Sequence, residues 1–184
     1  EIVQEALQCL VSSTGNLLEQ RVCDEGRLAE LSCLVSDPGA ACQPLHPDTP
    51  AACCAPLLTV FVALQDITQA MGPTMLCPGT HDAATHAAFD EVPGASRSNA
   101  DVLDRFGAVF ATCEAGTAVL MDSRLLHCGG ANLPVEDGGA RRRLFYTTWQ
   151  LPGNKPLGST YSIRDELQGM LRLSSFLGAR RIRS

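Results

Sequence analysis

Three residues at two places in the chain have the types and spacing of a metal site. His46-Pro47-Asp48 puts an imidazole and a carboxylate two residues apart, and His127 follows 81 residues after His46. Side chains two residues apart in an extended segment point to the same side, so His46 and Asp48 can bind one ion together. Two imidazoles and one carboxylate on one face of a metal are the ligand set of non-haem Fe(II) oxygenases. The spacing therefore predicts iron and oxygen chemistry.

Three consecutive arginines, Arg141, Arg142 and Arg143, follow the second histidine. In a strand, alternation places Arg141 and Arg143 on one face, with Phe145 and Thr147, and Arg142 on the other. An arginine that points into a sheet protein needs a charged partner, and an anionic ligand would supply one. The alternative is three solvent-facing arginines on a strand edge.

Each histidine also has a plain structural interpretation. An HPD tripeptide occurs in J-domain co-chaperones, but these need a helical hairpin, whereas here a proline-rich loop leads into a strand. A single histidine such as His127 is often a hydrogen-bonded core residue, although Gly129-Gly130 and the arginines that follow favour a ligand site. His81 and His86 lie in or near a polar stretch, where we expect exposed or supporting positions.

The composition limits the partners of the chain. A net charge of −6 argues against nucleic acid as a partner. Neither a signal peptide nor a long apolar run is visible, so we expect no membrane span and a cytoplasmic location. The nine cysteines include no CxxC pair, which predicts buried thiols in a reducing compartment rather than disulfides or a zinc site. A small-molecule substrate is the expected partner, and the sequence does not indicate an oligomeric state.

The elements needed to position these residues are mostly short strands. We expect one domain over residues 1–184, mainly β, an antiparallel sandwich or jelly roll with flanking helices. Residues 79–105 are small and polar without a sustained period, which predicts a lid or a disordered insert. Helices are expected at 2–11, 24–35 and 162–177, and strands at 57–66, 109–113, 117–122, 125–128 and 141–150.

Several motifs in this order resemble one known family. The segments are QPLHPDTP, LLTVFVALQDITQAMGPTMLCPGTH, GTAVLMDSRLLHCGGAN and RRRLFYTTW, within residues 43–149. Together they resemble the phytanoyl-CoA dioxygenase family. The resemblance implies a double-stranded β-helix (jelly roll) that binds Fe(II) and 2-oxoglutarate and uses dioxygen.

The resemblance also implies roles for individual residues. His46, Asp48 and His127 correspond to the iron ligands. Arg141 corresponds to the residue that pairs with the C5 carboxylate of 2-oxoglutarate, with Arg143 as the second candidate. Further candidates to line the site are Gln43 and Asn132, with Gln65 and Thr147 as weaker ones.

The implied reaction is hydroxylation of a small organic substrate with release of succinate and CO2. Asp48 favours hydroxylation over halogenation, because halogenating relatives have a small residue in place of this carboxylate. Only 45 residues precede His46, fewer than family members usually carry, so we expect an N-terminally truncated domain. Two alternatives remain: a catalytically silent jelly-roll domain that binds a ligand or a protein, and a cupin-type metalloenzyme that uses no oxo acid.

Overall fold

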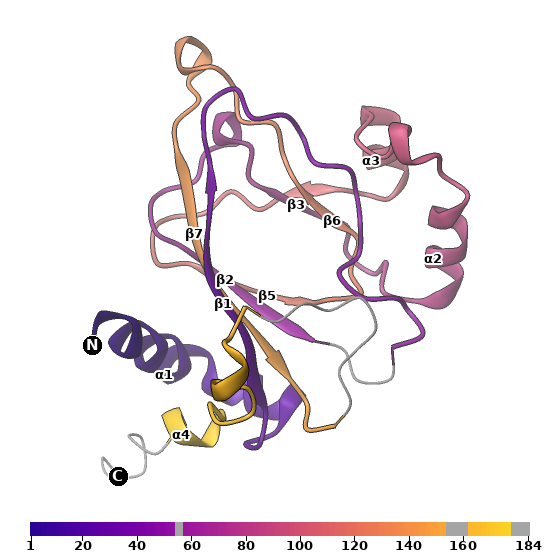
Figure 1. The fold of residues 1–184 in the computed structure, drawn as a ribbon. Coiled ribbons are helices and arrows are strands. Elements are labelled where there is room, and N and C mark those ends of the chain that lie inside the picture. Colours follow the sequence, from indigo (N-terminus) through magenta and orange to yellow (C-terminus); the bar gives the residue numbers. More distant parts are fainter. Residues whose placement is uncertain (54–56, 154–161, 178–184) are drawn as a thin grey trace.

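Two antiparallel sheets face each other in the computed structural model, which describes residues 1–53, 57–153 and 162–177. Figure 1 shows the strands and the helices that flank them. The major sheet has the strand order β1 (Arg27–Ser36), β7 (Arg142–Gln150), β2 (Leu58–Ala63) and β5 (Ala118–Asp122). The minor sheet has the order β4 (Val109–Phe110), β3 (Thr74–Leu76) and β6 (His127–Gly129).

The outer face of the major sheet is covered by the first helix, α1 (Ile2–Val22). Its buried side chains, such as Leu18, pack with Val60 of β2 and Trp149 of β7, and Trp149 is fully buried. Apolar residues at a helical spacing provide this buried stripe, and packing against a sheet stabilises such a helix more than its propensity does. The short α4 (Ser174–Leu177) lies beside α1 in Figure 1, and its Phe176 contacts Trp149 edge to face.

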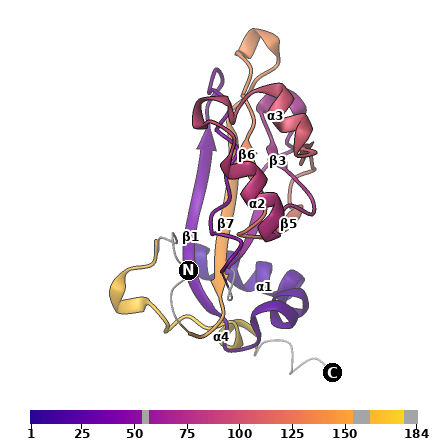
Figure 2. The same cartoon turned by 90° about the vertical axis from the view of Figure 1, so that its right-hand side faces the viewer.

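Two helices cover the outer face of the minor sheet, α2 (Ala83–Asp90) and α3 (Ala100–Arg105). The Asp82 side chain caps α2 by accepting hydrogen bonds from the Ala84 and Thr85 amides. Four apolar side chains from this region are buried against the minor sheet: Phe89, Val92, Val102 and Phe106. The prediction that residues 79–105 form a lid or a disordered insert is therefore wrong. Figure 2 shows α2 and α3 on one side of the molecule.

The space between the sheets is apolar at one end and open at the other. Phe61, Met121 and Leu144 of the major sheet form a small core there, against Leu76 and Leu125. The rest of the space is a cavity with polar walls. The layers are therefore helix, sheet, core with cavity, sheet and helices.

Several sequence predictions of elements hold, and others need correction. The predicted strands correspond to β2, β4, β5, β6 and β7, and the helix predicted at 2–11 extends to Val22. The helix predicted at 24–35 is wrong, because β1 occupies this region and pairs with β7 from Arg27 to Ser36. The helix predicted at 162–177 is reduced to α4 and one 3-10 turn. The 3-10 turns are η1 (Gln69–Met71), η2 (Gly94–Ser96), η3 (Val135–Asp137) and η4 (Asp165–Leu167).

Over the described ranges, the structure holds no helix with both the length and the apolar character that a membrane crossing needs.

Candidate metal centre

Backbone pairing brings the two histidines together. His46 and His127 form a β-bridge, with the His46 amide donating to the His127 carbonyl at 3.0 Å and the reverse bond at 2.9 Å. His46 therefore extends the minor sheet beside β6. The proline on each side of it, Pro44 and Pro47, keeps this stretch extended.

The third ligand candidate, Asp48, is fixed by contacts with Ser123. The Asp48 and Thr49 amides both donate to the Ser123 carbonyl, at 2.8 and 3.1 Å. The Ser123 hydroxyl lies 2.6 Å from the Thr49 hydroxyl and accepts a hydrogen bond from the Leu57 amide. Because Ser123 and Thr49 are buried, this network sets the position of the loop that carries Asp48.

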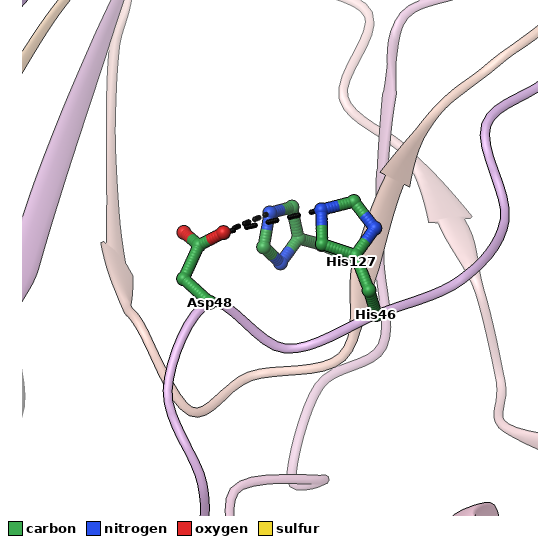
Figure 3. A group of neighbouring side chains, drawn as sticks. All are labelled: His46, Asp48 and His127. Atoms are coloured by element: carbon green, nitrogen blue, oxygen red, sulfur yellow. Dashed lines mark ion pairs between the residues drawn. The ribbon is translucent and has the colours of Figure 1, made fainter. Parts of the chain in front are cut away.

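The three side chains converge on one point (Figure 3). Asp48 Oδ1 lies 3.9 Å from His46 Nε2 and 3.7 Å from His127 Nε2. The ligand atoms of all three residues lie within 4.8 Å of one another. Two ligand atoms at about 2.0–2.2 Å from a common ion lie no more than about 4.4 Å apart, and both distances from Asp48 Oδ1 to the imidazole nitrogens are within this limit. The residues therefore fit a metal ion.

The hydrogen bonds of the imidazoles orient both rings for metal binding. His46 Nδ1 lies 2.8 Å from the Pro44 carbonyl, and His127 Nδ1 lies 2.9 Å from the Leu125 carbonyl. A carbonyl only accepts hydrogen bonds, so each Nδ1 carries the proton and each Nε2 presents a lone pair toward Asp48. Burial lowers the pKa of His127, against the opposing charge of Asp48. The imidazole therefore stays neutral, as a ligand must be.

The metal centre lies in the wall of a cavity of about 440 Å³ between the two sheets. The lining residues come from β1, β2 and β7 on one side and from β3, β6 and the loop before Asp48 on the other. This volume is in the range of small-molecule sites. Its polar lining includes Glu30, Gln43, Thr59, Thr74, Arg142, Tyr146 and Thr148.

Arg142 is buried at one end of this cavity, with 8% of its surface exposed. Its Nη1 lies 3.5 Å from the Thr74 hydroxyl, and its Nε has no hydrogen-bond partner within the described part of the chain. Burial lowers the pKa of the guanidinium, although it remains a cation. A buried cation without a carboxylate partner is costly, so its arrangement fits an anionic ligand in the cavity.

Gly129 allows the guanidinium to approach the metal-bearing strand. A Cβ at this position would lie 2.9 Å from Gln43 Oε1 and 3.5 Å from Arg142 Nη2. Gln43 itself lines the cavity and accepts a hydrogen bond from the Gly129 amide at 2.8 Å. A side chain at 129 would therefore fill the space between the metal ligands and Arg142.

The other two arginines of the cluster lie outside the cavity. Arg141 is exposed and forms an ion pair with Asp37 at the surface. Arg143 is exposed and lies 3.4 Å from Gln65 Oε1, and the Gln65 side chain also donates to the Arg141 carbonyl. Alternation along β7 therefore separates the arginines as the sequence indicated, and the face toward the cavity is that of Arg142.

Two further candidates also point away from the cavity. Thr147 is buried on the outer face of the major sheet, where its hydroxyl accepts a hydrogen bond from Trp149 Nε1 at 3.0 Å. Asn132 is buried and donates to the Ser36 and Ala140 carbonyls, at 3.0 and 2.8 Å. It therefore ties the loop between β6 and β7 to the end of β1, a structural contact close to Arg142.

The remaining histidines and the cysteine beside His127 have structural positions. His81 is exposed, while His86 is buried, with Nε2 2.8 Å from the Arg124 carbonyl. Cys128 is buried in the core beneath the minor sheet, and burial raises the pKa of its thiol to about 12. The eight cysteines that lie in the described ranges are all free thiols.

Sequence reasoning did not single out Arg142, Ser123, Tyr146 or Glu30 as site residues. Arg142 had a usable signal, because alternation had already separated it from its neighbours. Ser123 follows Asp122 in an ordinary turn and carries no motif. Tyr146 shares the face of Arg142, so the same alternation would have found it once that face was known.

One family model matches most of the chain. Residues 2–134 match the model of phytanoyl-CoA dioxygenase (PhyH). The chain belongs to this family. The matched range contains all three ligand candidates and confirms the resemblance drawn from the motifs. No curated protein matches the sequence.

Solved structures confirm the jelly-roll fold. EvdMO1 superposes with a TM-score of 0.57 at 19% identity, covering 75% of this chain and 30% of that one. The α-ketoglutarate-dependent carbocyclase SnoK from nogalamycin biosynthesis gives 0.53 at 23% identity, covering 73% and 53%. The nickel complex of the non-haem monooxygenase ThoJ gives 0.53 at 18%, covering 78% and 51%. The chain thus spans about a third to a half of the length of these proteins.

The expected cofactors agree with these findings. The family is one of Fe(II)- and 2-oxoglutarate-dependent oxygenases, and this chain carries the His-Asp-His set that such chemistry needs. The similar structures include a carbocyclase and a monooxygenase, so fold and family leave the type of oxidation open.

Proposed function

We propose that this protein is an Fe(II)- and 2-oxoglutarate-dependent oxygenase that hydroxylates a small organic substrate and releases succinate and CO2. One observation carries the proposal. Arg142, a buried guanidinium that has no carboxylate partner among the described residues, lies in the same cavity as the three converging metal ligands. A metal site alone fits many functions, whereas a metal with a buried cation at this spacing fits a metal-chelating dicarboxylate.

The spacing along β6 supports 2-oxoglutarate as that dicarboxylate. Arg142 lies against Gly129, two residues from the ligand His127. Two residues of a strand span about 7 Å. This is a suitable distance for a five-carbon 2-oxo acid whose oxo-acid end is at the metal and whose far carboxylate is at the guanidinium.

The chain itself supplies binding and orientation. His46 and His127 present Nε2 to the metal because their Nδ1 protons are held by the Pro44 and Leu125 carbonyls. Arg142 pairs with the far carboxylate of the co-substrate, and Thr74 holds the guanidinium in place. Bound Fe(II) supplies the redox chemistry with dioxygen, in which decarboxylation of 2-oxoglutarate is coupled to oxidation of a substrate C–H bond.

Gln43 is proposed to complete the co-substrate site. Its oxygen accepts a hydrogen bond from the Gly129 amide, so the side-chain NH2 group remains as a donor. It lies on the cavity wall beside Arg142 and Gly129. A carboxylate there would receive hydrogen bonds from the guanidinium and from this amide.

The co-substrate anchor is therefore Arg142 rather than Arg141 or Arg143. Arg141 already pairs with Asp37 at the surface, and Arg143 points to the opposite side of β7 from the cavity. Thr147 and Asn132 are proposed to act on structure. The Thr147 hydroxyl accepts a hydrogen bond from Trp149 within β7, and Asn132 ties the loop before β7 to Ser36 of β1. The cytoplasmic location remains a prediction.

The deciding experiment is anaerobic. The protein is loaded with Fe(II), 2-oxoglutarate is added, and the visible charge-transfer band of the chelate is recorded. The band should appear in the wild type and in His81→Ala, whose histidine is exposed and outside the site. It should be absent in His127→Ala.

The arginine variants then test the anchor. Arg142→Met should weaken 2-oxoglutarate binding strongly, while Arg141→Met and Arg143→Met should bind as the wild type does. Iron binding without the band would reject the oxygenase proposal and favour a binding domain without turnover. Given the band, formation of one succinate per hydroxylated product distinguishes hydroxylation from other oxidations.

A further inference from the structure

The loop that carries Asp48 is held at more than one point, and Ser123 is the first of them. The Asp48 and Thr49 amides donate to the Ser123 carbonyl, at 2.8 and 3.1 Å. The Asp48 side chain is 41% exposed, whereas that of His127 is 8% exposed. Packing therefore fixes Asp48 less than it fixes His127, and the backbone of the loop has to set the position of the carboxylate.

The second point is the imidazole of His86, which comes from α2 on the outer side of the minor sheet. Its Nδ1 accepts a hydrogen bond from the Ala51 amide at 3.2 Å, and its Nε2 lies 2.8 Å from the Arg124 carbonyl. A carbonyl only accepts hydrogen bonds, so Nε2 carries the proton and Nδ1 is the acceptor. His86 is buried, and backbone groups occupy both of its ring nitrogens.

This tautomer of His86 is the reverse of the one at the metal centre. His46 and His127 carry the proton on Nδ1 and present Nε2 to the metal. His86 carries the proton on Nε2, and its Nδ1 lone pair already accepts a hydrogen bond. His86 is therefore not a further metal ligand, and it acts on the backbone around the site instead.

Both contacts of His86 lie next to the attachment of Asp48. Ala51 is three residues after Asp48 on the same loop, in a turn rather than a strand. Arg124 directly follows Ser123, whose carbonyl receives the Asp48 amide. One imidazole thus joins the two chain segments that meet at Asp48, and it gives the Ala51 amide the partner that a neighbouring strand would otherwise supply.

The helix α2 gives His86 a rigid base. The Asp82 carboxylate accepts hydrogen bonds from the Ala84 and Thr85 amides at the start of the helix. Three residues after His86, Phe89 is buried in the core beneath the minor sheet. A helix that is capped at one end and packed into a core at the other can hold the imidazole in one place.

We propose that His86 is a positioning residue of the metal centre, which acts through the Ala51 amide to hold Asp48 beside the two imidazoles. The inference rests on the proposed function only in that His46, Asp48 and His127 bind the metal. Groups that orient metal ligands from behind commonly change metal affinity by about 10- to 100-fold when they are removed. Loss of this contact should therefore weaken metal binding, although His86 does not touch the ion.

The test uses Co(II) alone as the probe, since its visible ligand-field spectrum reports the coordination geometry. Affinity is measured by calorimetry on the metal-free protein without 2-oxoglutarate, at a low temperature where circular dichroism confirms folding. His86→Phe keeps a ring of similar size and removes both hydrogen bonds. It should lower Co(II) affinity by about tenfold or more and change the ligand-field spectrum.

Two variants separate positioning of the loop from general stability. Phe89→Leu, in the same helix, should lower the melting temperature through lost packing while Co(II) affinity stays within about twofold of the wild type. His86→Asn places its side-chain oxygen where Nδ1 lies and so keeps an acceptor for the Ala51 amide. It should retain Co(II) affinity within about threefold of the wild type.

His86→Gln makes the opposite change. Its side-chain NH2 group lies where Nε2 lies, so it keeps the donor toward the Arg124 carbonyl and moves the acceptor away from Ala51. It should bind Co(II) as weakly as His86→Phe, and it decides the question if His86→Phe does not fold. In the wild type, NMR of the imidazole nitrogens should show His86 as the Nε2–H tautomer.

Four results would overturn the assignment: wild-type affinity in His86→Phe or His86→Gln, no recovery in His86→Asn, an equal loss in Phe89→Leu, or an Nδ1–H tautomer of His86. Failure of the oxygenase proposal gives a different signature. There the Fe(II)·2-oxoglutarate band is missing while Co(II) still binds, and the comparison of the His86 variants still decides. No Co(II) binding by the wild type would overturn both.

Discussion

The two faces of the major sheet are built from the same strands and have opposite characters. On the outer face of β7, Phe145 and Trp149 pack against α1 within a continuous apolar core. On the inner face, Arg142, Tyr146 and Thr148 line a polar cavity opposite the metal ligands. Adjacent residues of one strand thus contribute either to folding or to binding.

The inner, binding face lowers the folding stability of the protein, and the packing of the outer face compensates for this loss. Over the ranges that the structure describes, the buried Arg142 has no carboxylate partner and the Tyr146 phenol lies near two carboxylates, and both features lower stability. Burial of Trp149, Leu28 and the apolar side of α1 provides the compensating stability. Variants of the two faces should therefore change different measured quantities.

The largest effect is expected for 2-oxoglutarate affinity in Arg142→Met. Loss of a buried charge partner costs about 3–5 kcal/mol, which corresponds to about two to four orders of magnitude in affinity. The metal-free variant should melt no lower than the wild type, because an unpaired buried charge is removed. Arg143→Met, on the other face, should change neither quantity. Unchanged co-substrate affinity in Arg142→Met would contradict the assignment of binding to the inner face.

Trp149→Ala, on the outer face, should lower folding stability and leave 2-oxoglutarate affinity unchanged. Truncation of a fully buried tryptophan costs about 3–5 kcal/mol of folding free energy. Urea unfolding followed by circular dichroism measures this loss. At low temperature, where the variant remains folded, its iron and 2-oxoglutarate affinities should match the wild type. A parallel loss of both would mean that the two faces act as one unit.

Thr147→Val tests whether Thr147 lines the co-substrate site, as the sequence predicted, or only supports the packing of the outer face. The change keeps the shape but leaves the buried Trp149 Nε1 without its acceptor, which costs about 1–3 kcal/mol of stability. Co-substrate affinity should stay the same. A reduced affinity without reduced stability would restore Thr147 as a residue that lines the site.

The smallest expected effect is a pH dependence of folding stability, which arises from Tyr146 on the inner face. Burial raises the pKa of Tyr146 above its unfolded value, and the charge of Glu30 adds to this. The folded state therefore favours the neutral phenol, and stability that is present below about pH 10 falls as the pH rises through the folded pKa. Melting temperatures of the metal-free wild type between about pH 8 and 11 should fall more steeply than those of Tyr146→Phe.

The comparison of the wild type with Tyr146→Phe isolates the contribution of the Tyr146 phenol to the pH dependence of stability. The buried thiols of Cys77 and Cys128, with pKa values of about 11 and 12, contribute equally to both proteins. Identical pH profiles would show that the phenol ionises as easily in the folded protein as in the unfolded chain.

The three candidate metal ligands could be singled out from the sequence because their signal is local. His46 and Asp48 share one tripeptide, and His127 lies in a short strand before two glycines. The arginine facing the cavity could not be selected in this way. Alternation separates Arg142 from Arg141 and Arg143, but the face that points inward depends on pairing of β7 with β1 and β2, which are distant in sequence.

The main errors in the predicted elements have the same origin. Residues 24–35 contain good helix formers, yet nearly continuous pairing with β7 makes Arg27–Ser36 a strand. Residues 79–105 lack a period because α2 and α3 are short and each buries one apolar side chain, Phe89 in α2 and Val102 in α3. Tertiary contacts decide both regions, and no window of sequence contains those contacts.

The β-bridge between His46 and His127 has a consequence for how this protein acquires its metal. Backbone hydrogen bonds, not the ion, close the loop of chain between the two imidazoles. The entropic cost of closing that loop therefore belongs to folding and not to metal binding. The backbone itself holds the two imidazoles side by side, and a bound ion would add its binding free energy to the stability of the folded state. An ion exchanged at this position would leave the surrounding architecture in place.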